Sequence, residues 1–151
     1  MSKGILALSL LLLTVLSHAT TLQPLTLTDQ WDKPQLLDSN VSLLVFSNHK
    51  KGSAWVKTAL QELKAADLGA QHWLYVSNIS SMPGLITKMF ALPKMRKYAF
   101  PVALIRDDSL VENWPKKKGF VAVYSLSDLE ITAVEHFDSA ATIKRYLQDK
   151  M

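Results

Sequence analysis

Residues 41–76 read VSLLVFSNHKKGSAWVKTALQELKAADLGAQHWLYV, and this stretch decides the fold class. The uninterrupted apolar run at 43–46 predicts a strand that is buried on both faces, as in a parallel sheet. A polar, turn-forming segment follows, and Ser53 is expected to cap the next helix. Apolar residues recur there at helical spacing, and Gly69 is expected to close the helix before a second buried strand at 73–76. The stretch therefore predicts a βαβ unit.

The rest of the chain extends this unit without a linker, a repeat or a low-complexity stretch. Alternation at 22–28 predicts an edge strand, and the turn-forming residues at 30–40 predict a loop. Helical spacing returns at 85–92, where Pro93 is expected to interrupt it. The remaining expected elements are buried strands at 102–105 and 120–124, a strand at 131–137 that forms an antiparallel hairpin with its predecessor, and a helix at 140–147. The pattern predicts one α/β domain.

Composition limits the chemistry more than any single motif does. The chain has 151 residues, of which 48% are apolar and 20% charged, as is ordinary for a globular domain. It contains no cysteine. Disulfides, thiolate nucleophiles, Fe–S clusters and cysteine-built zinc sites are therefore excluded. Its histidines lack the close spacing of a metal motif, and we expect neither a metal nor a cofactor.

The first nineteen residues have the three-part pattern of a secretory signal peptide. Lys3 gives a positive start, an apolar run follows at 5–16, and small residues lead to Ala19. The run is shorter than the roughly 20 residues that a membrane span needs. We therefore expect cleavage between Ala19 and Thr20 and a periplasmic mature chain, residues 20–151, without a membrane span. An uncleaved N-terminal anchor is the alternative.

The order of elements is that of a thioredoxin-like sheet, and its extra strands resemble the peroxiredoxin and TlpA variants. We therefore expect a central mixed sheet flanked by helices. In redox-active relatives of this fold, the turn before the first helix carries the reactive cysteine, whose thiolate the helix N-terminus stabilises. Here that turn, residues 48–53, has none, and Lys118-Gly119 stand where a cis-proline is expected. Thiol oxidoreductase, isomerase and peroxidase activities are thus excluded.

Several segments together resemble the YtfJ family of small exported bacterial proteins. They are Leu44-Val45-Phe46, Lys51-Gly52-Ser53-Ala54, Tyr75-Val76-Ser77-Asn78, Met82-Pro83-Gly84, Lys97-Tyr98-Ala99-Phe100-Pro101, Val111-Glu112-Asn113-Trp114, Val123-Tyr124 and Ala133-Val134. The resemblance covers most of residues 41–147 and implies a periplasmic protein with a thioredoxin-like fold. It implies no catalytic mechanism. The chain departs from the family at Ser125-Leu126-Ser127-Asp128, where an Asp-Lys-Asp-Gly-like turn is expected.

Basic residues gather around the cysteine-free turn. The candidate anion site comprises His49, Lys50, Lys51 and Ser53 at the helix N-terminus, whose free N–H groups favour anions, and Lys116, Lys117 and Lys118 before the strand expected nearby. We therefore predict a binding or scaffold protein for a small anion or an acidic periplasmic partner. A solvated turn with a capping serine is the alternative. The formal charge of +4, or +3 without the leader, does not indicate a nucleic-acid partner.

An enzyme with non-thiol chemistry at residues 49–53 is the alternative function. Ser53 and His49 are the available nucleophile and base, although the sequence shows no orienting acid and no nucleophile elbow. Asp107 and Asp108 are adjacent, which favours a turn over paired acid–base catalysis. A pocket that brings together a base, a nucleophile and an oxyanion donor would favour the enzyme, whereas scattered exposed lysines would favour binding.

Overall fold

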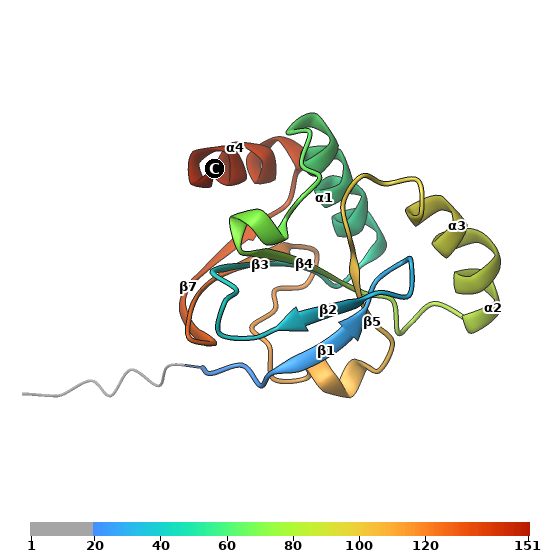
Figure 1. The fold of residues 1–151 in the computed structure, drawn as a ribbon, viewed down its shortest axis with the longest axis horizontal. Helices are drawn as coiled ribbons and strands as arrows, with labels where there is room; N and C mark the ends of the chain where they lie inside the picture. Colours follow the sequence, from blue (N-terminus) through green and yellow to red (C-terminus); the bar gives the residue numbers. More distant parts are fainter. Residues whose placement is uncertain (1–19) are drawn as a thin grey trace, which may run out of the picture.

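The computed structural model describes residues 20–151, so the predicted signal peptide and its cleavage site at Ala19 fall outside or at the edge of the described residues. Seven strands form one mixed sheet in the order β2-β1-β5-β4-β3-β6-β7 (Figure 1). The strands are β1 (Leu25–Thr28), β2 (Pro34–Leu37), β3 (Leu43–Ser47), β4 (Trp73–Asn78), β5 (Ala103–Ile105), β6 (Val121–Ser127) and β7 (Glu130–Phe137). Strands β3, β4 and β5 are parallel, and the outer pairs are antiparallel.

The helices cover both faces of this sheet. Helix α1 (Lys50–Glu62) and helix α4 (Ala140–Lys150) pack together on one face, and the 3-10 helix η3 (Asp108–Val111) lies on the other (Figure 1). A short 3-10 turn, η1 (Gly69–Gln71), precedes β4. No helix within residues 20–151 is long and apolar enough to cross a membrane.

One further helical stretch, the α2–α3 segment, lies beside α1. It consists of α2 (Gly84–Ile86), a π-helical turn η2 (Thr87–Ala91) and α3 (Leu92–Met95). Proline removes a backbone donor from a helix, and a π turn is one way in which a helix absorbs such a defect. Pro93 therefore does not interrupt the helical path as expected; the path continues through a widened turn.

The two core layers follow from alternation along β3. Leu43 and Val45 pack on the α1 and α4 side, whereas Leu44 and Phe46 point to the other side. There the Phe46 ring meets the Trp114 ring edge-on, with 5.0 Å between ring centroids. An apolar run without polar breaks is thus explained by burial on both faces, as predicted.

The predicted sheet is confirmed, since the runs at 43–46, 73–76, 102–105 and 120–124 all contribute strands to it. The predicted hairpin is β6–β7. Its turn residues Asp128 and Leu129 both have positive φ, 51° and 69°. A two-residue loop with positive φ at both positions matches the right-handed twist of the flanking strands.

Two expectations about the first half are wrong. Residues 30–40 are not all loop, because β2 forms there and pairs with β1 antiparallel, which makes β2 the edge strand instead of β1. Proline is tolerated as the first residue of an edge strand, and Pro34 occupies that place. Gly69 does not close α1, which ends at Glu62; Lys64 takes the left-handed conformation, with φ of 53°.

A buried glutamine ties the α2–α3 segment to the sheet. The Gln30 side chain is fully buried, and its Nε2 donates to the Phe100 carbonyl at 2.8 Å and to the Met95 carbonyl at 3.3 Å. Its Oε1 accepts from the Val102 N–H at 2.7 Å. Arg96 Nε in turn donates to the Gln30 carbonyl at 2.8 Å. These bonds fix the chain between α3 and β5, which forms one wall of the groove described below.

Candidate functional site

Helix α1 begins earlier than the sequence indicates. Its N-cap is His49, whose extended backbone has φ of −157° and ψ of 160° and whose side chain makes no capping bond. The expectation that Ser53 caps the helix is therefore wrong, since Ser53 already lies in its first turns. Gly52 permits this start because a Cβ there would lie 2.7 Å from His49 Cε1 and 2.9 Å from Val121 Cγ2. The absence of a side chain lets the His49 ring and β6 approach the helix.

The Ser53 side chain belongs instead to a cluster of hydroxyl groups at the end of the sheet. Its Oγ lies 2.9 Å from Ser47 Oγ and 3.1 Å from Ser77 Oγ, and Ser47 Oγ lies 3.1 Å from the Tyr75 hydroxyl. Burial raises the pKa of Tyr75, and the hydrogen bonds from the serines oppose this. Within residues 20–151, Ser53 makes no side-chain hydrogen bond with His49, so the nucleophile–base pair considered above is not assembled.

On one side of α1 lies a basic hollow of about 420 Å³, lined by His49 and by residues 116–120 among others. Of the residues at 49–53 that were expected to converge with the lysines at 116–118, His49 lines the hollow, whereas Lys50, Lys51 and Ser53 do not. Lys116 Nζ donates to the Val111 and Glu112 carbonyls at the end of η3. Lys117 Nζ lies 4.2 Å from the centroid of the Phe120 ring. Two of the three lysines therefore have partners, whereas Lys118 forms no ion pair or hydrogen bond within the described chain.

His49 Nε2 is the one buried side-chain polar atom without a hydrogen-bond partner in the part of the chain that the structure describes. The ring packs edge-on against Trp55, with 5.6 Å between centroids. The turn after Lys118 depends on Gly119, whose φ of 83° is one that glycine adopts without strain. No cis peptide occurs within residues 20–151, so the Lys118-Gly119 link is not a cis equivalent of the redox proline.

On the other side of α1 lies the α1–α3 groove, of about 310 Å³. Helix α1 supplies Lys50, Ser53 and Lys57 to it, and Tyr75 comes from β4. The opposite wall comes from residues 82–102 and includes Ile86, Phe90, Lys94 and Met95. The groove has an apolar interior, hydroxyl groups toward the sheet and lysines at its edges, and no carboxylate lines it.

The predicted site residues are therefore divided between two places. Lys50 and Ser53 line the groove, while His49 and the lysines at 116–118 line the basic hollow. Lys51 is exposed and lines neither. Sequence reasoning missed Lys57 and Lys94; Lys57 follows Lys50 by seven residues, which places both on one face of a helix.

The adjacent acids form a turn, as predicted. Asp107 caps η3, accepting from the Ser109 N–H at 3.0 Å and the Ser109 hydroxyl at 2.7 Å. These bonds lower the pKa of Asp107. The Asp108 carboxylate accepts from Asn78 Nδ2 at 2.8 Å and, like Asp107, does not line the groove. No group of three or more His, Asp or Glu side chains in residues 20–151 is arranged to hold a metal ion.

Comparison of the sequence with protein-family models and with curated proteins gives no match. Solved structures do match. A candidate thiol:disulfide interchange protein DsbE from Chlorobium tepidum is 13% identical over 87% of this chain and 93% of its own, with a TM-score of 0.59. StoA from Bacillus subtilis is 12% identical over 83% and 96%, with a TM-score of 0.57. Peroxidoxin BcpB from Mycobacterium tuberculosis is 14% identical over 87% and 92%, with a TM-score of 0.55.

These likenesses establish the fold and nothing finer. The chain has a thioredoxin-like fold, as predicted, with a mixed sheet flanked by helices. It has this fold without any cysteine. A thioredoxin-like frame therefore surrounds a site in which the polar groups at the start of α1 are hydroxyls, an imidazole and lysines.

Proposed function

We propose that this chain is an exported periplasmic member of the YtfJ family that binds an anionic ligand or an acidic partner surface without thiol redox chemistry. The signal-peptide pattern that ends at Ala19 supports export, and the resemblance over residues 41–147 supports the family. Cleavage after Ala19 would be checked by N-terminal sequencing of the protein from the cell envelope. An intact Met1 on the mature product would refute export with cleavage.

The observation that carries the binding function is the set of unpaired lysines that line the groove and the basic hollow. Lys50, Lys57 and Lys94 at the groove and Lys118 at the hollow form no ion pair or hydrogen bond within residues 20–151, and no carboxylate lines either depression. Lysines held near one another repel, and an anion between them removes that repulsion. The free N–H groups at the N-terminus of α1 favour negative charge near Lys50, which is the first residue of the helix.

A labelled hexaglutamate peptide tests this function as a defined anionic probe. We expect residues 20–151 to bind it, and the affinity to fall between about 20 and 300 mM NaCl because the Debye length shortens to below about 8 Å. The double variant Lys50→Glu/Lys57→Glu is expected to lose most of the binding, because both lysines line the groove. The matched control is Lys64→Glu/Lys150→Glu, which changes the charge equally on exposed lysines after α1 and at the end of α4.

Equal binding by both double variants, or binding that does not respond to salt, would contradict the proposed anion site. Thiol chemistry has its own test. The chain is expected to show no insulin reduction and no peroxidase turnover above buffer, because it has no sulfur atom that can form a disulfide.

A further inference from the structure

We propose that the α1–α3 groove takes a single-chain amphiphile with an anionic head group, such as a medium-chain carboxylate. This inference rests on the proposed anion-binding function and specifies its ligand class. It starts from the combination of features in one place: an apolar interior, lysines on both edges and hydroxyl groups toward the sheet.

The size and walls of the groove suit a short hydrocarbon chain. Its volume of about 310 Å³ is at the lower end of small-molecule sites. Met82, Ile86, Phe90 and Met95 line it, and methionine side chains adapt well to a flexible apolar ligand.

The lysines occupy both edges of the groove. Lys50 and Lys57 stand two turns apart on the same face of α1, and Lys94 faces them from α3. Because no carboxylate lines the groove, a ligand's head group would be the only negative charge among three ammonium groups. Charge complementarity therefore selects an anionic amphiphile over a neutral one.

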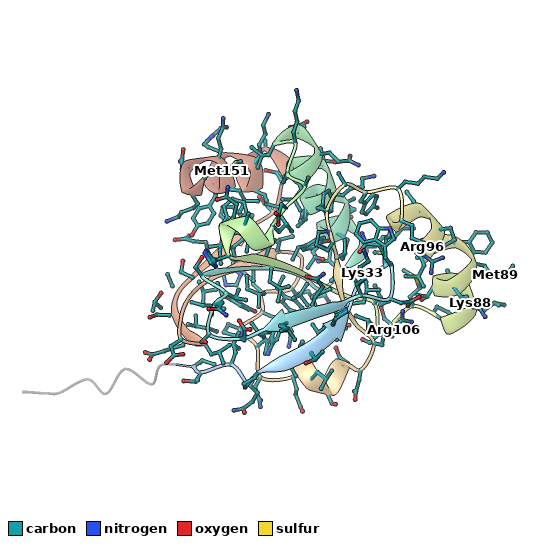
Figure 2. All side chains as sticks on the ribbon, viewed as in Figure 1. Lys33, Lys88, Met89, Arg96, Arg106 and Met151 are labelled. Carbon is teal, nitrogen blue, oxygen red and sulfur yellow. The ribbon has the colours of Figure 1, made fainter. Side chains whose placement is uncertain are left out.

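A second observation is the apolar surface that continues outward from the groove. Phe90 lines the groove and is 64% exposed, and its neighbours Leu85 and Met89 are 68% and 58% exposed. Figure 2 shows Met89 and Lys88 projecting from the α2–α3 segment on the side away from the sheet. Contiguous exposed apolar side chains indicate a contact surface. A ligand chain longer than the groove would lie on this surface.

The shape of the groove favours a single lipid-like molecule over a bilayer surface as its ligand. A flat membrane surface would contact the exposed side chains of the α2–α3 segment, but it would not reach Tyr75 or fill the interior of the groove. A single chain fills the interior while its head group reaches the lysines at the edges.

Isothermal titration calorimetry of residues 20–151 tests the ligand class with three probes below their aggregation limits: decanoate, acetate and decanol. Decanoate is expected to bind at least about tenfold more tightly than acetate, which lacks the chain, and than decanol, which lacks the charge. Phe90→Ser is expected to weaken decanoate by about tenfold while leaving hexaglutamate binding unchanged, because it removes apolar contact only. The side chain is largely exposed, so folding is not at risk.

A second set of variants tests the lysines at the edges of the groove. Lys57→Gln/Lys94→Gln is expected to weaken decanoate by at least about tenfold, and the matched control Lys64→Gln/Lys150→Gln is not. Lys118→Gln separates the two depressions: it belongs to the basic hollow and should leave decanoate binding unchanged.

The possible failures are distinguishable. Decanoate that binds no better than acetate, with hexaglutamate binding intact, would overturn the amphiphile and keep the anion-binding function. If Lys118→Gln loses decanoate binding and Lys57→Gln/Lys94→Gln does not, the anion lies in the basic hollow, and the assignment of the ligand to the groove is overturned. No binding of any anion would overturn both proposals. Binding to phosphatidylglycerol vesicles without binding of free decanoate would assign the apolar surface to a membrane and would also overturn the inference.

Discussion

Replacing the buried Gln30 by methionine is expected to destabilise the protein more than any surface substitution. The two side chains are similar in length, so the change removes hydrogen bonds with little change in volume. It leaves the Phe100 carbonyl and the Val102 N–H without their partners at 2.8 Å and 2.7 Å, at a site with no solvent access. A buried polar group without a partner costs about 1–3 kcal/mol, so the two together cost about 2–6 kcal/mol in free energy of unfolding.

Urea denaturation of residues 20–151 measures this loss. With a slope of about 2 kcal/mol per M, the midpoint is expected to fall by about 1–3 M. Gln35→Met is the matched control: Gln35 lies in the same β1–β2 hairpin, is only half-buried, and donates one bond of 3.0 Å to Asp29. A loss below about 1 kcal/mol at Gln30, or equal losses at both positions, would refute the assigned role of Gln30.

Three further outcomes are expected. Phe46→Ala should lower the free energy of unfolding, measured by urea denaturation, by about 3–5 kcal/mol, because the ring is buried against Trp114. A negligible loss would contradict the placement of Phe46 in the core. Gly52→Ala should cost about 1–3 kcal/mol, because its Cβ would meet His49 Cε1 at 2.7 Å, and unchanged stability would show that the His49 ring is free to move. Burial raises the pKa of the Tyr124 hydroxyl well above its usual value of 10.0. The unfolded chain therefore loses this proton at a lower pH than the folded chain, and the free energy of unfolding should fall as the pH rises above about 10. An ultraviolet titration in which every tyrosine of the folded protein ionises together near pH 10 would contradict this.

The central strands of the fold could be predicted from the sequence because each one corresponds to a local run of apolar residues. Residues 43–46 and 73–76 are uninterrupted apolar runs, and burial on both faces is the physical reason. Strand β2 could not be predicted in this way. It is a short edge strand with proline at its start, and only its pairing with β1 defines it.

The candidate site was predictable only in part, for a similar reason. The meeting of His49 with the lysines at 116–118 follows from two strand ends that share one edge of the sheet, and the structure confirms that they line one hollow. The groove depends on tertiary packing. Tyr75 and Lys94 come from separate elements, and no local pattern brings them to α1. The role of Ser53 was misjudged because its partners, Ser47 and Ser77, lie on two different strands.

Chemical-shift mapping tests most directly whether the edge of the sheet around the start of α1 is an anion site. Backbone amide signals of residues 20–151 would be followed by NMR during titration with hexaglutamate at low and at high salt. We expect saturable shifts around Lys50, Lys57 and Lys94 or around Lys118, which diminish as salt screens the charges. Shifts that are absent, that do not respond to salt, or that are confined to β7 and the end of α4 would contradict an anion site at the start of α1.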